Sequence, residues 1–214
     1  MEGFFFKNSI TFCFFDKYIL DLVKLFAHML TIKPKKGNLL IAEPSIIGDT
    51  SFNRSIVLLA DHNPEGSVGF ILNKPLEYTI NDLVPEIEAP FKVYNGGPVE
   101  QDNLYFIHGV PELIPNSIEI SNGVYWGGDF SKLADLIVDN KISESDIRFF
   151  LGYSGWEASQ LENELKSNAW VVTENIYKRG IIGKDYESFW KEKMMEFGEE
   201  YSIWSNAPEN PNYN

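Results

Sequence analysis

The clearest pattern in the sequence lies between residues 149 and 170, where an apolar run is followed by turn residues and then by apolar residues at helical spacing. Residues 149–151 form an apolar run of the kind that a buried strand shows. The next four residues, Gly152-Tyr153-Ser154-Gly155, are expected to turn, because glycines allow sharp bends and close backbone contacts. Ser154 and Glu157 have the three-residue spacing of a capping box, which indicates a helix that begins at Ser154. The residues expected on the inner face of this helix are Ala158, Leu161 and Leu165.

Apolar runs bounded by turn residues predict further strands. Residues 55–60 and 67–73 flank the turn-forming residues 61–66, and together they predict an antiparallel hairpin. Their apolar residues are continuous rather than alternating, so both faces of this hairpin are expected to be covered. Shorter strands are expected at 38–43, 91–94, 104–108, 118–120, 124–126 and 170–172, the fourth and fifth of them forming a second hairpin.

Three further short helices are indicated by capping residues and helical spacing. Thr79 with Asp82 forms a capping box for a helix over residues 79–87, Asp129 caps a helix that runs to residue 138, and a last helix covers residues 188–197. Phe52 is expected to plug into the core. Strands interspersed with short helices predict an α+β fold, in which a mixed or antiparallel sheet or a barrel-like core is flanked by these helices.

The chain is expected to hold one folded domain, residues 37–200, between two dissimilar ends. Residues 1–36 are predicted to lie outside the fold, and residues 201–214, rich in Pro and Asn, form a flexible tail. Charges such as Asp16 and Lys17 interrupt the apolar positions of the N-terminal end, which argues against a membrane span. The alternatives for this end are a loosely packed extension, an amphipathic interfacial helix, or translation that begins at Met29.

Charge and cysteine content narrow the function classes. The formal net charge is −13; residues 1–36 carry six Lys against three Asp and Glu, or +3, so the remainder carries −16. Such an acidic body repels phosphate backbones, and direct nucleic-acid binding is not expected. The one cysteine, Cys13, excludes an internal disulfide and a cysteine metal cluster, which fits a cytoplasmic protein.

Ser154 invites comparison with the nucleophile elbow of hydrolases, which places glycine two residues on each side of the serine. Gly152 fits the first position, but Trp156 occupies the second, and the base would have to be His62 or His108. Ser154 as a helix cap is therefore the favoured interpretation. A cap predicts that Ser154→Asp restores the stability that Ser154→Ala loses.

The other candidate groups give weaker signals. His62 and His108 lack the spacing of metal ligands, so neither a metal nor a cofactor is predicted. Gly96 and Gly97 could present backbone N–H groups to an anion, although two glycines before Pro98 are more typical of a forced turn. The five tryptophans are assigned to the core rather than to base stacking, because the chain has no basic stripe.

Several ordered motifs resemble one known family. The motifs are Gly37-Asn38-Leu39-Leu40-Ile41-Ala42-Glu43-Pro44, Arg54-Ser55, Gly69-Phe70-Ile71-Leu72-Asn73-Lys74-Pro75, Gly96-Gly97-Pro98-Val99, Leu151-Gly152-Tyr153-Ser154-Gly155-Trp156 and Gln160-Leu161-Glu162 with Trp170. They resemble the YqgE/AlgH family of uncharacterised bacterial proteins, and the resemblance extends from about Gly37 to Trp190. Ser159 departs from the family, whose members usually have a glycine there. The resemblance implies an α+β fold with a sheet or barrel-like core and the label of transcriptional regulator, but no established reaction and no catalytic set.

A non-enzymatic cytoplasmic module, regulatory or binding a protein partner, is the favoured function. The alternative is an enzyme of unknown reaction that uses a groove beside the Gly-Tyr-Ser-Gly-Trp turn; direct DNA binding is the third, disfavoured by charge. No catalytic residue is assigned. The candidate functional surface consists of Asn73, Gly96, Gly97, His108, Tyr153, Ser154, Trp156 and Gln160.

Overall fold

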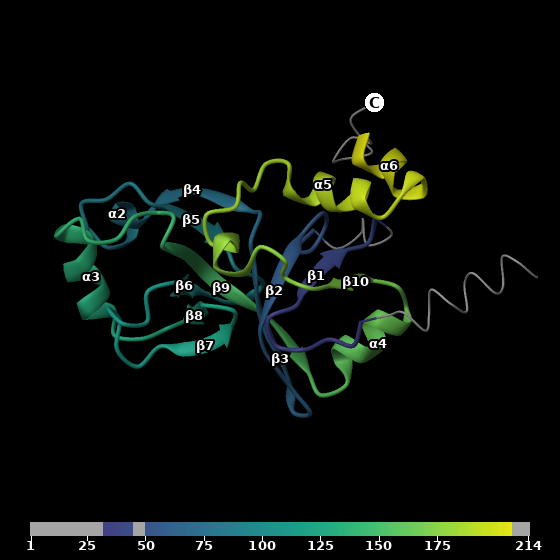
Figure 1. Ribbon diagram of the computed structural model, residues 1–214, viewed down its shortest axis with the longest axis horizontal. Helices are drawn as coiled ribbons and strands as arrows, with labels where there is room; N and C mark the ends of the chain where they lie inside the picture. Colours follow the sequence, from purple (N-terminus) through teal and green to yellow (C-terminus); the bar gives the residue numbers. More distant parts are fainter. Residues whose placement is uncertain (1–31, 45–49, 207–214) are drawn as a thin grey trace, which may run out of the picture. The chain divides into compact units, whose positions relative to one another are not determined.

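The computed structural model describes residues 32–44 and 50–206 (Figure 1). The chain divides into two units, Met1–Lys33 and Pro34–Asn214, and the fold described below belongs to the second unit. The expectations for residues 1–31 and for residues 207–214 lie outside the described residues. No helix within the described ranges is long and apolar enough to span a bilayer.

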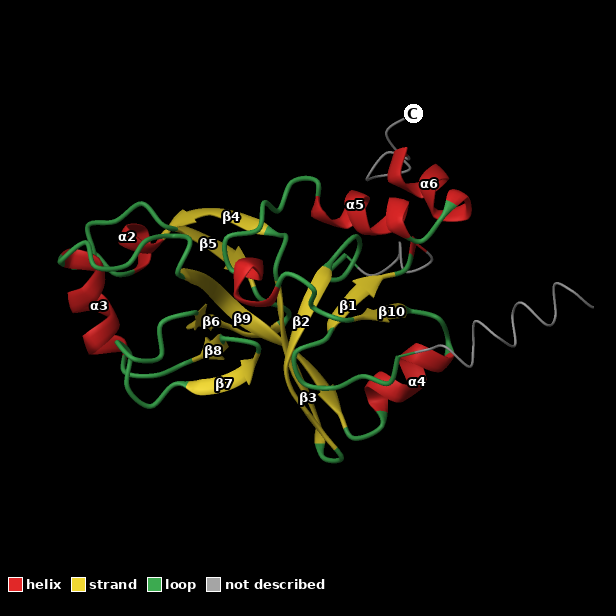
Figure 2. Ribbon diagram, viewed as in Figure 1, coloured by secondary structure: helices red, strands yellow, loops and turns green. Residues whose placement is uncertain are grey.

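One open sheet of ten strands dominates the fold (Figure 2). Its main path follows the order β10-β1-β2-β3-β9-β6-β8-β7, and a side branch places β5 on β9 and β4 on β5. All pairs are antiparallel except β5 with β9. The sheet is open, which confirms the α+β prediction in its sheet form rather than as a closed barrel. The strands are β1 (Leu39–Ala42), β2 (Ile56–Asn63), β3 (Gly66–Ile71), β4 (Pro75–Thr79), β5 (Lys92–Asn95), β6 (Val99–His108), β7 (Ile118–Ser121), β8 (Val124–Trp126), β9 (Ile147–Glu157) and β10 (Trp170–Thr173).

Short helices lie around this sheet. In Figure 1, α3 stands beside the β6–β8 end, α4 lies beside β10, and α5 and α6 lie together above β1. Residues 201–206, which we expected in the tail, form the second part of α6 instead, and the Tyr201 hydroxyl donates to Glu43 Oε1 at 2.9 Å. The helices are α2 (Ile80–Leu83), α3 (Phe130–Val138), α4 (Gln160–Lys166), the 3-10 helix η2 (Lys178–Ile181), α5 (Phe189–Glu196) and α6 (Glu199–Asn206).

Two helix caps are confirmed by hydrogen bonds. The Asp129 side chain accepts from the Lys132 backbone N–H at 3.0 Å, as expected for the cap of α3. The Thr79 backbone N–H donates to Asp82 Oδ2 at 2.8 Å, which satisfies one donor at the start of α2. This helix ends at Leu83, sooner than the sequence predicted.

The hairpin of β2 and β3 is covered on both faces, as the continuous apolar runs predicted. Along β2, Ile56 and Leu58 belong to one core cluster, whereas Val57 and Leu59 belong to another. The alternation follows from strand geometry, since successive side chains point to opposite faces. Phe52 enters the second cluster and packs against Trp170, with ring centroids 5.2 Å apart, as expected. A third cluster lies between α3 and the β5–β6–β9 part of the sheet.

Strand β9 connects the branches of the sheet. The turn predicted at residues 152–155 is wrong, because these residues lie within this strand. It runs without a break through Ser154 to Glu157. Its first part pairs with β5 and β6, and its last part, Ser154–Glu157, pairs with β3. Gly152 has φ +71° within the strand, so its glycine signal marks a local irregularity rather than a chain reversal. Pairing with three strands satisfies the backbone groups that the expected helix would have satisfied, and this favours the extended conformation.

The helix after β9 begins later than the sequence predicted. Ser159, not Ser154, occupies the N-cap position of α4, and it adopts φ +65° in the left-handed region. Glycine adopts this conformation without steric cost, which explains why members of the family that the sequence resembles usually have a glycine at this position. Leu161 of the expected inner face is buried and Leu165 is packed against the same core, whereas Ala158 lies exposed before the helix.

Candidate functional site

Ser154 lies inside the protein and bonds to the Gly-Gly segment. Its side chain is 0% exposed, and its hydroxyl donates to the Gly96 carbonyl oxygen at 3.0 Å. The two motifs touch through their backbones. A Cβ on Gly96 would lie 2.1 Å from the Gly152 carbonyl oxygen, and one on Gly97, at φ +147°, would lie 2.4 Å from the Ser154 nitrogen. The glycines are therefore required by close packing, and Ser154 is not the helix cap that its spacing indicated.

Neither of the two histidines considered as bases is placed to activate Ser154. His108 is buried, its Nδ1 accepts from the Val110 backbone N–H at 3.3 Å, and its Nε2 lies 3.2 Å from the Gly127 carbonyl oxygen. These partners fix the neutral tautomer with the proton on Nε2, and burial lowers the pKa of His108. His62 Nδ1 instead bonds the Ser67 hydroxyl at 2.7 Å. Across the ranges that the structure describes, no three His, Cys, Asp or Glu residues gather closely enough to hold a metal ion.

Trp156 and Gln160 meet at a carboxylate that the sequence analysis missed, Glu164 of α4. Its Oε2 accepts both the Trp156 and the Trp170 indole N–H, at 2.8 and 2.7 Å. Its Oε1 accepts from the Gln160 side-chain amide at 2.9 Å. Gln160 in turn accepts from the Glu157 backbone N–H at 3.0 Å. The cluster connects α4 to β9 and β10. The four-residue spacing of Gln160 and Glu164 was the sequence signal from which their contact could have been predicted.

Removal of the Glu164 carboxylate is expected to destabilise the fold. Glu164→Ala should lower the free energy of unfolding by about 2–3 kcal/mol, because two indole N–H groups lose a charged acceptor. Glu162→Ala on the same helix is the matched control: its carboxylate lies 3.9 Å from His62 Nε2 and is half exposed, so it should cost about 1 kcal/mol or less. Urea titration of both variants checks the difference, and equal losses would contradict the role given to Glu164.

The remaining predicted residues have separate partners. Asn73 accepts from the Ile56 backbone N–H at 2.7 Å and donates to the Arg54 carbonyl oxygen at 2.8 Å. The Tyr153 ring meets the Tyr105 ring edge-on, with centroids 5.6 Å apart. The structure thus brings Ser154 together with the glycine pair, and Trp156 together with Gln160. Of the eight candidates, the buried ones are Gly96, Gly97, His108, Ser154 and Trp156.

A charged cavity lies elsewhere, around Arg148 at the start of β9. The cavity has a volume of about 220 Å³ and is bounded by β5, by the start of β9 and by residues 182–186. Arg148 is 5% exposed; its Nη1 donates to the Leu72 carbonyl oxygen at 2.7 Å and its Nη2 to that of Lys184 at 2.6 Å. The guanidinium also lies 4.5 Å from the centre of the Tyr94 ring. An arginine next to an apolar run was the sequence signal from which this site could have been predicted.

Two lysines on the wall of this cavity differ in how their charge is used. Lys92 Nζ donates to the Tyr186 hydroxyl at 2.8 Å, and this bond raises the pKa of Lys92. Lys184 Nζ instead forms an ion pair with Glu192 of α5 at 2.7 Å. Lys92 and Arg148 therefore carry positive charge at the cavity without a direct carboxylate partner among the described residues.

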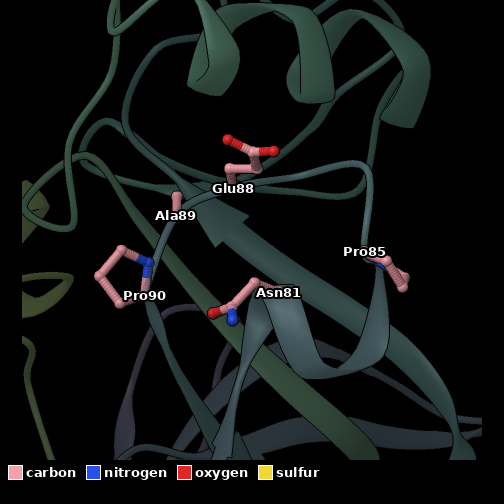
Figure 3. Close-up of a pocket in the computed structure, with 5 residues that line it drawn as sticks. All are labelled: Asn81, Pro85, Glu88, Ala89 and Pro90. Carbon is pink, nitrogen blue, oxygen red and sulfur yellow. The ribbon is translucent and has the colours of Figure 1, made fainter.

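A larger cavity, of about 340 Å³, lies beside α2 and carries little chemistry. Figure 3 shows its lining side chains spread around it, with the Glu88 carboxylate directed away from Asn81. Glu88 is its one ionisable group, and two of the other lining residues are prolines, Pro85 and Pro90. The Arg148 cavity is therefore the better candidate for binding.

Comparison with known proteins shows which family this chain matches. Residues 39–202 match a family described as AlgH-like. The UPF0301 protein BF2109 of Bacteroides fragilis is 40% identical over 187 residues, which cover 86% of this chain and 93% of that protein. A UPF0301 protein of Bacteroides thetaiotaomicron is 41% identical over the same length and with the same coverage.

Solved structures share the fold. Protein DIP2367 of Corynebacterium diphtheriae superposes with a TM-score of 0.67 at 22% identity, covering 86% of this chain and 97% of that one. The AlgH protein of Pseudomonas aeruginosa gives a TM-score of 0.63 at 24% identity, covering 83% and 98%. At these identities the likeness shows a common fold.

Proposed function

Since this chain belongs to the AlgH-like family, also known as YqgE/AlgH and UPF0301, we propose that it is a non-enzymatic cytoplasmic module, with a regulatory role that it exerts by binding another protein. One observation carries the proposal: the Ser154 hydroxyl is buried and donates to the Gly96 carbonyl oxygen. A nucleophile must be reachable by substrate and must have a base within hydrogen-bonding distance. Ser154 has neither, so the motif supports the fold.

Exposed apolar side chains on the last helices support a protein partner. Ile203 and Trp204 on α6 are 73% and 42% exposed, and Met195 on α5 is also exposed. Exposed aromatic and large apolar side chains on adjacent helices are typical of protein-interaction sites. The −16 charge of the chain after residue 36 favours a protein partner over the phosphate backbone of DNA.

The enzyme alternative predicts a reactive serine, and covalent labelling separates the two functions. Incubation of the full chain with a serine-directed fluorophosphonate should give no adduct at Ser154, because the reagent cannot reach a side chain that is 0% exposed. Intact-mass spectrometry followed by peptide mapping measures the adduct, with an active serine hydrolase in a parallel reaction as the control. Stoichiometric modification of Ser154 would overturn the proposal and favour an enzyme.

A further inference from the structure

We propose that the cavity beside Arg148 binds a small molecule through an oxyanion group, a phosphate or a carboxylate, held by Arg148 and Lys92. The site goes beyond the proposed regulatory function and does not depend on it. It is separate from the motif residues around Ser154, which the fold uses internally.

Arg148 is a buried cation at the wall of this cavity. Arg148 forms no ion pair with any residue that the structure describes. A guanidinium has five N–H donors, and two of them donate to the carbonyl oxygens of Leu72 and Lys184. Burial lowers the pKa of Arg148, and the charges of Glu144 and Asp185 offset this only in part. An oxyanion in the adjoining cavity would place a further opposite charge beside the guanidinium, and guanidinium groups suit phosphate and carboxylate geometry.

Lys92 lines the same cavity. Lys92 is exposed, and its Nζ lies 4.6 Å from the centre of the Tyr186 ring, besides its bond to the Tyr186 hydroxyl. Lys92 likewise forms no ion pair within the described residues. Lys184 is excluded from the proposed contact, because Glu192 already pairs with its ammonium group. The two cations thus have different tasks: Arg148 is a fixed internal donor, and Lys92 is an accessible one.

Two acidic residues on the cavity wall limit the charge of the ligand. Glu144 Oε1 accepts from the Lys92 backbone N–H at 2.8 Å, and Asp185 Oδ1 accepts from the Glu187 backbone N–H at 3.2 Å. These backbone bonds partly satisfy the carboxylates, but their charges remain near the cavity and oppose a polyanion. A volume of about 220 Å³ corresponds to about seven water molecules. Size and charge together indicate a small ligand of low charge.

Titration of the full chain with sodium phosphate, and separately with sodium acetate, tests the site at constant ionic strength. Backbone amide NMR signals follow the binding, with Gly183 and Arg148 as reporters. At least one of the two anions should give saturable shifts confined to the cavity segments, and the anion that does so identifies the ligand group. Lys92→Gln should weaken that binding about fivefold or more. Lys166→Gln, which removes the same charge from the exposed face of α4, should leave it unchanged.

Three results would overturn the proposal: shifts that stay linear with both anions, shifts spread evenly over surface lysines, or saturable binding that Lys92→Gln does not weaken. Lys92 is exposed, so its variant keeps the fold and the test remains decisive even if Arg148 variants unfold. Failure of the titration would leave the labelling result at Ser154 unaffected, which separates this site from the proposed function.

Discussion

Arg148→Met should lower the free energy of unfolding by about 2–4 kcal/mol, because it leaves two buried acceptors without donors. Methionine retains much of the apolar volume of the arginine side chain, but it donates no hydrogen bonds. The carbonyl oxygens of Leu72 and Lys184 would then lose the donors that hold them at 2.7 and 2.6 Å, and buried acceptors without partners are costly. The cation contact with the Tyr94 ring would also be lost.

Guanidinium chloride titration measures this loss, and Arg179→Met provides the matched control. Arg179 pairs with Asp146 at 2.7 Å, but half of its side chain is exposed. Exposed ion pairs contribute little to stability, so the control should cost about 1 kcal/mol or less. If the two substitutions cost the same, Arg148 does not connect the strand to the 182–186 segment as the structure indicates.

The importance of Arg148 could not be predicted from the sequence, because its contacts are distant along the chain. Its two carbonyl acceptors lie 76 and 36 residues away. Local patterns identify residues 149–151 as a strand, but they do not show which backbone groups that strand meets. The sequence therefore predicted the strand and missed the cavity at its start.

Elements determined by neighbouring residues were predicted correctly. The turn between β2 and β3 and the turn between β7 and β8 join strands that follow one another in the chain, so local turn residues sufficed. The Asp129 cap of α3 likewise depends on a residue only three positions away. In such cases the local preference and the tertiary structure agree.

Residues 152–157 were predicted incorrectly, because local and long-range interactions favour different structures there. Glycine content and the spacing of Ser154 and Glu157 favour a turn and a helix cap. Hydrogen bonding of the same residues to β3 keeps them extended, so the helix begins only at Gln160. The candidate residues were chosen from the motifs, and motif membership does not distinguish a buried side chain from an accessible one.

Ser154 allows a direct comparison of the two structures that its sequence permits. Ser154→Ala should cost only about 1 kcal/mol, because the Gly96 carbonyl oxygen still accepts from the Ile71 backbone N–H at 3.0 Å. Ser154→Asp should be far more harmful. It would bring a carboxylate into a position that is 0% exposed and opposite a carbonyl oxygen, at a cost of about 4 kcal/mol or more.

The central claim is that the Ser154 motif stabilises the fold from a buried position. The most direct test is a denaturant titration that compares the wild type with Ser154→Ala and Ser154→Asp. The buried position predicts that the alanine variant is slightly less stable than the wild type and that the aspartate variant is the least stable by several kcal/mol. A helix cap would give the opposite order for the two variants, because aspartate caps as well as serine does. An aspartate variant as stable as the wild type would contradict the account.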